Sequence, residues 1–325
     1  MKKSNFIMDK IFKMNLNYVR LQNKSKELFF KDLDNNIEFK QFKAELEELW
    51  DNIDHSYLQD DLTEFEAFIH ENNVGAELEI KHDNYIPLIA LTAILKTNDK
   101  FVRVKEREYK NALKSYAYKN DKQDYLKLKV SQYNNQVVPY YSRTTGELLR
   151  YVQPSTYNSM IQNTNLTRTG WNTTLNDADL LRDVSFYIPY HNFSCIYCAQ
   201  YQGRLLSKSE VLNFISGELE EQEGDILHPN CKCVLTIYND DRIPTRPQIN
   251  EAEIEEQYNI RQKVNALTLR KEEVLSDMKI QKGLGNQDEV DKLNQKRNKI
   301  NSQIRELVNQ LPTEELRKQV VAINR

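Results

Sequence analysis

All four cysteines of this chain lie in one segment, between Cys195 and Cys233, although the chain has 325 residues. Cys195 and Cys198 are separated by two residues, and His228 and Cys231 repeat that spacing before Cys233 ends the segment. A two-residue spacer lets two side chains face one ion, and Zn²⁺ in structural sites takes four nitrogen or sulfur ligands in a tetrahedron. The spacing therefore predicts a zinc site formed by four of these five side chains, and it leaves open which four.

Three other interpretations of the cysteines stay open: reduced thiols that merely pack together, one or two disulfides, and a nucleophilic cysteine. A catalytic thiolate needs a histidine base with an orienting partner, and only His191 and His228 lie near the cysteines in the sequence. A metal site with four protein ligands is closed, and closed sites are structural. The glycine motifs that bind nucleotide phosphates are also absent from the sequence. We therefore expect a protein that is not an enzyme.

The elements that would position these residues divide into three regions. Residues 1–135 carry apolar residues at helical spacing and predict a helical region. Residues 136–243 contain short β-branched and aromatic runs bounded by Gly, Pro or Asn, which predict a small α+β module around the Cys/His cluster. Within it, the Asn- and Thr-rich stretch 154–175 is expected to be a helix plus loops. Residues 244–250 contain two prolines and predict a linker.

The last region, 251–325, has the pattern of an antiparallel helical hairpin or coiled coil. Apolar residues alternate spacings of four and three on both sides of a glycine-containing turn at residues 282–286. Pro312 ends the second helix, and Thr313 is expected to cap a short third one. Such a hairpin usually serves as an interaction element, and the chain could form an oligomer through it. The predicted fold class is thus α+β and predominantly helical.

Charge separates one segment from the rest of the chain. The net charge of −3, with a pI near 6.1 and a mean hydropathy of −0.73, excludes a protein that binds nucleic acid over its whole surface. Residues 100–129 are locally basic and interleaved with tyrosines. They predict either a nucleic-acid contact or an amphipathic helix with tyrosines on its buried side. The candidate contacts are Lys100, Arg103, Lys105, Arg107, Lys110 and Lys114.

No run of apolar residues is long enough to cross a bilayer, and the N-terminus lacks the apolar core of a secretory signal. We therefore expect no membrane span and synthesis in the cytoplasm of the host cell. In such a reducing compartment, clustered cysteines favour metal binding over disulfides.

The cysteine segment resembles that of a known family. Residues 151–238, with Cys195, Cys198, Gly203 and the ending His-Pro-Asn-Cys-Lys-Cys at 228–233, resemble the minor capsid and head-morphogenesis proteins of tailed bacteriophages, including the Mu F-like group. Lys232 replaces the arginine that is usual in that ending. The helices before and after this segment lie outside the resemblance.

The resemblance implies a structural virion protein in the capsid interior near the portal vertex. Its implied partners are the portal protein and/or the major capsid protein, and phage DNA during packaging or ejection. An alternative from another class is a zinc-braced nuclease, because His228 near an upstream cysteine pair is a feature of such enzymes. A plain nucleic-acid-binding protein is the third hypothesis.

Overall fold

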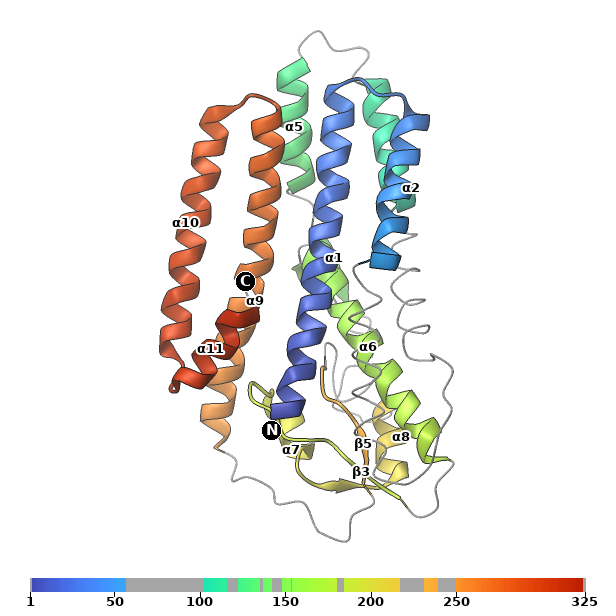
Figure 1. Cartoon of the computed structure of the whole chain (residues 1–325), viewed down its shortest axis with the longest axis vertical. Coiled ribbons are helices and arrows are strands. Elements are labelled where there is room, and N and C mark those ends of the chain that lie inside the picture. The colour runs from blue at the N-terminus through green and yellow to red at the C-terminus, as the bar shows by residue number, and fades with distance from the viewer. Residues whose placement is uncertain are drawn as a thin grey trace.

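The computed structural model describes residues 2–56, 102–115, 122–134, 137–141, 148–152, 154–179, 184–216, 231–238 and 250–323. The predicted class is confirmed, because long helices dominate and only short antiparallel strands accompany them (Figure 1). Within these residues, no helix combines the length and the apolar character that a membrane crossing requires.

The N-terminal region is helical, as predicted. It contains α1 (Lys2–Asp34), α2 (Phe39–Ser56), a helix over residues 102–115 and α5 (Lys122–Asn134). Between α1 and α2 the chain turns at Asn36, whose φ of 54° is a left-handed conformation that asparagine tolerates. The core here is aromatic: Phe42 stacks on Tyr109 with ring centroids 3.8 Å apart, and the Tyr109 hydroxyl donates to the carbonyl of Ile37.

The central region holds two small antiparallel sheets, which confirms the predicted strands. β1 (Val138–Tyr141) pairs with β2 (Leu148–Val152), and β3 (Ser185–Tyr187) lies between β4 (Leu205–Leu206) and β5 (Thr236–Tyr238). Two short helices, α7 (Ile196–Tyr201) and α8 (Lys208–Ser216), complete the module. The stretch expected to be a helix plus loops is instead one helix, α6 (Pro154–Ala178).

The C-terminal hairpin is present, with bounds close to the predicted ones. α9 (Glu251–Gly283) turns into α10 (Gln287–Gln310), and their seam buries Val274, Leu293 and Ile300. α11 (Glu314–Ile323) follows, and the Thr313 hydroxyl accepts a hydrogen bond from the backbone N–H of Leu316, which confirms the predicted cap. The predicted linker lies outside the described residues except for Asn250.

α9 also packs along α1, at the far end of the sequence (Figure 1). Four ion pairs join the two helices: Asp9–Arg261, Arg20–Glu272, Lys26–Asp277 and Glu27–Lys279. The N-terminal region and the hairpin, which the sequence predicted as separate regions, therefore share one helical bundle. The α+β module lies at one end of that bundle, near the start of α1.

Candidate metal centre

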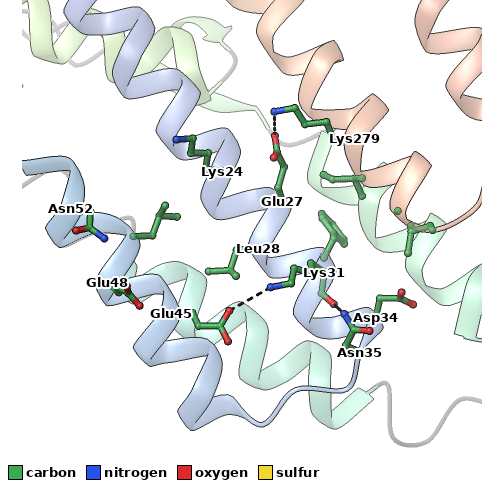
Figure 2. A pocket seen from close by; sticks show the side chains of 15 residues that line it. Lys24, Glu27, Leu28, Lys31, Asp34, Asn35, Glu45, Glu48, Asn52 and Lys279 are labelled. Carbon is green, nitrogen blue, oxygen red and sulfur yellow. Dashed lines mark hydrogen bonds and ion pairs between the residues drawn. The ribbon is translucent and has the colours of Figure 1, made fainter. Parts of the chain in front are cut away.

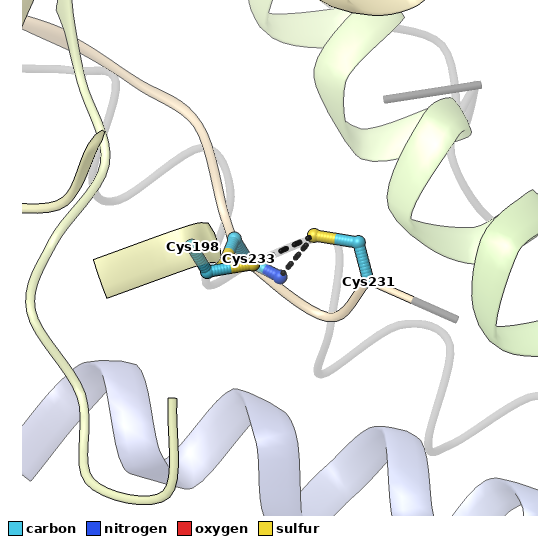
Figure 3. Close-up of side chains that lie close together, drawn as sticks. All are labelled: Cys198, Cys231 and Cys233. Atoms are coloured by element: carbon cyan, nitrogen blue, oxygen red, sulfur yellow. Dashed lines mark hydrogen bonds between the residues drawn. The ribbon is translucent and has the colours of Figure 1, made fainter. Parts of the chain in front are cut away.

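Three cysteine sulfurs meet in the interior of the α+β module. The Sγ atoms of Cys198, Cys231 and Cys233 all lie within 4.8 Å of one another, and the three residues are at most 3% exposed (Figure 3). The Sγ atoms of Cys198 and Cys231 are 3.7 Å apart, much farther than the roughly 2.05 Å of a disulfide, and all four cysteines are free thiols. The structure thus brings together three of the five predicted ligands.

The dimensions of this cluster fit a tetrahedral metal ion. Metal–sulfur bonds of about 2.3 Å at tetrahedral angles separate two sulfurs by roughly 3.8 Å, which matches the separation of Cys198 and Cys231. The donors are soft sulfur atoms removed from water, the kind of set that binds zinc or similar ions. The cluster could therefore hold a metal ion through these three thiols and one further ligand.

Cys195 lies at the edge of the cluster rather than in it. It is the N-cap of α7, and its Sγ accepts a hydrogen bond of 3.4 Å from the backbone N–H of Cys198. This contact follows from the two-residue spacer, because an N-cap side chain reaches the N–H three residues later. The fifth predicted ligand, His228, lies outside the described residues, and so does the residue on which the nuclease hypothesis depends.

α6 positions the other cysteine-bearing segment through three hydrogen bonds. The Thr167 hydroxyl donates to the carbonyl of Cys231 at 2.6 Å, and the Trp171 indole N–H donates to that of Cys233 at 2.7 Å. The Thr174 hydroxyl donates to the carbonyl of Leu235 at 3.0 Å. Donors at helical spacing thus meet alternate carbonyls of the segment, since one helical turn rises about as far as two extended residues. The helix fixes the segment in one register.

His191 is a residue of the site that the sequence analysis did not place among the ligands. Its Nε2 lies 3.4 Å from the Sγ of Cys233 and 2.9 Å from Nε2 of Gln202, and its Nδ1 lies 3.0 Å from the Ser194 hydroxyl. Burial lowers the pKa of His191, so the neutral imidazole is favoured. A neutral imidazole is also the form that binds metals. Its position four residues before Cys195 was the available signal.

The thiols are held in their protonated form when no metal is bound. Hydrogen bonds with Cys195, Cys231 and Cys233, together with burial, raise the pKa of Cys198 well above its ordinary value. For Cys233, a hydrogen bond with Cys198 lowers the pKa, but the hydrogen bond with Cys231 and burial outweigh it and the pKa rises. Metal binding must therefore displace protons, which makes it depend on pH.

Lys232 projects away from the two cysteines that flank it, as alternation along an extended segment requires. Its Nζ lies 6.0 Å from the ring of Phe12 on α1, and it lines a small cavity together with Asp9 and Arg261. Burial and then the charge of Arg261 lower the pKa of Lys232 to about 8, and burial lowers that of Arg261 to about 10. Burial raises the pKa of Asp9 to about 6. The cysteine segment thus contacts the bundle through buried charges.

The structure distributes the candidate nucleic-acid contacts unevenly. Arg103, Arg107, Lys110 and Lys114 are exposed and recur every three or four residues along the helix over residues 102–115, so they share one face. Lys105 is instead buried, with its Nζ 2.7 Å from a carboxylate oxygen of Glu108 and 3.8 Å from the Tyr133 ring centroid. Lys100 lies outside the described residues.

A larger cavity of about 690 Å³ lies elsewhere, between α1, α2 and α9 (Figure 2). Its apolar wall includes Leu28, Leu49 and Ile280. Charged side chains surround this wall, and two ion pairs bridge them, Glu27–Lys279 and Lys31–Glu45. The cavity contains none of the predicted site residues.

Comparison with models of protein families, with curated proteins and with solved structures finds no match to this chain. The family resemblance of the cysteine segment therefore stays a prediction.

Proposed function

We propose that this chain is a structural protein, a minor capsid or head-morphogenesis protein of a tailed bacteriophage, whose central module is held together by a zinc ion. The observation that carries the proposal is the buried cluster of Cys198, Cys231 and Cys233. The sulfurs are removed from solvent and held by α6 and α7, an arrangement that suits a structural metal more than one that must admit a substrate. The same segment carries the resemblance to the phage family.

The long helices suit this role because they offer extended surfaces to large partners. We propose that these partners are the portal protein and/or the major capsid protein, and that the chain resides in the capsid interior near the portal vertex. The outer surface of α10 is free of contacts with α1, since α9 lies between them in the bundle.

Two measurements test the proposal. Elemental analysis of the purified chain is expected to give one zinc per chain, and Cys198→Ser is expected to lose it. Mass spectrometry of purified virions is expected to find the chain, and the portal protein is expected to co-purify with it. A chain without stoichiometric metal would refute the zinc centre, whereas a metal-bearing chain absent from virions would refute the capsid role alone.

The basic face of the helix over residues 102–115 supports contact with DNA as a second element of the function. Four exposed cations in line, Arg103, Arg107, Lys110 and Lys114, match the regular spacing of backbone phosphates. The double variant Arg107→Glu/Lys110→Glu is expected to lower DNA affinity and flatten its dependence on salt. A matched control, Lys296→Glu/Lys299→Glu on the exposed face of α10, makes the same charge change elsewhere. Equal losses in both variants would show only a general charge effect.

A further inference from the structure

Two buried cations lie directly behind the cysteine cluster. Lys232, between the two cluster residues Cys231 and Cys233, is 8% exposed. Arg261 of α9 is 5% exposed, and its guanidinium carbon lies 5.7 Å from the ring of Phe12 and 5.5 Å from that of Phe193. Phe193 adopts φ 61°, an uncommon conformation for a bulky residue. The packing therefore holds the guanidinium in place between two rings.

The described residues supply too little negative charge for these cations. Arg261 Nη2 forms an ion pair of 3.4 Å with Asp9, whereas its Nη1 has no hydrogen-bond partner among the described residues. The other polar side chains around the cavity are neutral amides, at Asn192, Gln262, Asn265 and Gln319. One carboxylate thus faces two cations, and buried charges are normally paired.

The cysteines can supply the missing charge only when they are ionised. A divalent ion bound by three thiolates and a neutral ligand leaves one net negative charge, and a fourth thiolate leaves two. Lys232 follows one of these cysteines and precedes the other, so its charge lies close to both. Together with Asp9, a centre of this kind balances the two cations within about one unit of charge.

We propose that Lys232 and Arg261 are positioning residues that stabilise the ionised thiolates of the centre as fixed counter-charges, while Asp9 weakens their effect. This inference rests on the proposed zinc centre. It gives a role to Lys232 in the His-Pro-Asn-Cys-Lys-Cys ending, where a cation separates two ligands. It also means that metal binding stabilises the contact between the α+β module and helices α1 and α9.

The three charges make predictions of opposite sign. Lys232→Met and Arg261→Met are each expected to weaken zinc binding about 10- to 100-fold, the usual effect of losing a group that supports metal ligands. Asp9→Asn is expected to strengthen it, because the two cations then act on the thiolates without opposition. Lys232→Arg keeps the charge and is expected to bind zinc as the wild type does. A role in packing alone would not make Asp9→Asn bind more tightly.

The measurement is competition between the full-length chain and a chelator of known zinc affinity, over a range of pH. Lys232→Met is expected to release zinc at a higher pH than the wild type, and Asp9→Asn at a lower pH. The absorption spectrum of the cobalt(II)-substituted chain checks that the number of bound thiolates is unchanged. The matched control is Lys105→Met, which removes a buried lysine that pairs with Glu108 and packs on Tyr133 of α5.

The possible outcomes separate the two proposals. If the wild-type chain binds no zinc, the proposed function fails. If it binds zinc and Lys232→Met binds equally well, or if Asp9→Asn weakens binding, the counter-charge role alone is refuted. The cavity beside these residues, of about 10 Å³, has room for one water-sized particle. Stabilisation of the zinc-loaded chain by chloride, lost in Lys232→Met, would likewise refute the role by assigning the cations to a small anion.

Discussion

Asp32 carries a carboxylate in a place that suits a neutral side chain. It is 1% exposed, and neither of its carboxylate oxygens has a hydrogen-bond partner in the described part of the chain. Lys31 Nζ lies 3.8 Å from one oxygen, but that lysine is mostly exposed to solvent. Burial, followed by the negative charge of Glu45, raises the pKa of Asp32 to about 6 from its ordinary 3.8. The folded state therefore favours the protonated form.

This environment predicts that Asp32→Asn stabilises the protein by about 1–3 kcal/mol near pH 7.5. Between the unfolded and the folded pKa, the folded chain binds more protons than the unfolded one, so stability falls as pH rises through this window. The gain should accordingly shrink as pH falls from about 7 towards 4. Urea unfolding at several pH values measures it, with Asp51→Asn on the exposed face of α2 as the control for net charge. A gain that does not vary with pH would contradict the prediction.

At the residue scale, the sequence predicted ligand types better than their surroundings. Cys198, Cys231 and Cys233 were identified because cysteine is rare in the chain and the spacing suits a metal. His191 was not assigned to the site, because its approach to Cys233 depends on how the loop before α7 folds back. The role of Lys232 was equally hidden, since the cations and the carboxylate that meet there come from α1, α9 and the cysteine segment.

At the scale of elements, the turn between α9 and α10 contains a matched pair of glycines. Gly285 adopts φ +72°, and the N–H of Asn286 donates to the carbonyl of Gln281 across the turn. This is the usual left-handed ending of a helix. Gly283 is the last residue of α9 and has no such φ. A Cβ on either glycine would meet nothing within 4 Å, so sterics with neighbours do not distinguish them.

Alanine at these two positions is therefore expected to act in opposite directions. Gly283→Ala should raise the free energy of unfolding by about 0.5–1 kcal/mol, because alanine loses less backbone entropy in a helix. Gly285→Ala should lower it by about 1–2 kcal/mol, because a Cβ disfavours the left-handed conformation. Thermal unfolding of the two variants tests this, each serving as the other's control. Two changes of the same sign would mean that the turn is not formed as described.

α6 shows where element-level prediction from sequence fails. Its Asn and Thr residues have low helix propensity, so loops were expected within it. Tertiary contacts override that preference: Trp171 and Leu175 are buried in the module core, and Thr174 donates to carbonyls both within the helix and in the cysteine segment. The heptad pattern of α9 and α10 was predicted correctly because its apolar positions pack mainly against each other. Local patterns suffice only when the partner is close in sequence.

At the scale of the whole molecule, α1 and α9 are parallel helices in constant register. Each of their four ion pairs joins residues that are 251 or 252 positions apart. A constant offset arises only when two helices run side by side in the same direction. Nothing within either helix encodes this pairing, which explains why the sequence suggested two separate helical regions.

The pair Lys26–Asp277 tests how much the two ends of the chain depend on each other. Both side chains are less than 10% exposed. Lys26→Met is expected to cost about 3–5 kcal/mol, because it leaves Asp277 buried without its counter-ion, whereas Lys26→Met/Asp277→Leu should recover most of that loss. Chemical denaturation of the two variants measures both values. A double variant as unstable as the single one would show that the lysine acts through packing, for instance on Tyr133.

The chain contains two tryptophans, Trp50 and Trp171, which report separately on the bundle and on the metal centre. Trp171 donates its indole N–H to the carbonyl of Cys233, whereas Trp50 lies in the aromatic core with Tyr18. If metal binding stabilises only the α+β module, a chelator should shift the emission of Trp50→Phe, which retains Trp171, to longer wavelength.

The converse variant, Trp171→Phe, should change little, and most of the helical ellipticity at 222 nm should remain, because the long helices pack on one another without the cysteines. Lys232 and Arg261 nevertheless join the module to the bundle, so the helices should unfold at a lower temperature once the metal is removed. Simultaneous loss of Trp50 emission and helical signal on chelation would show instead that the module and the bundle fold as one unit.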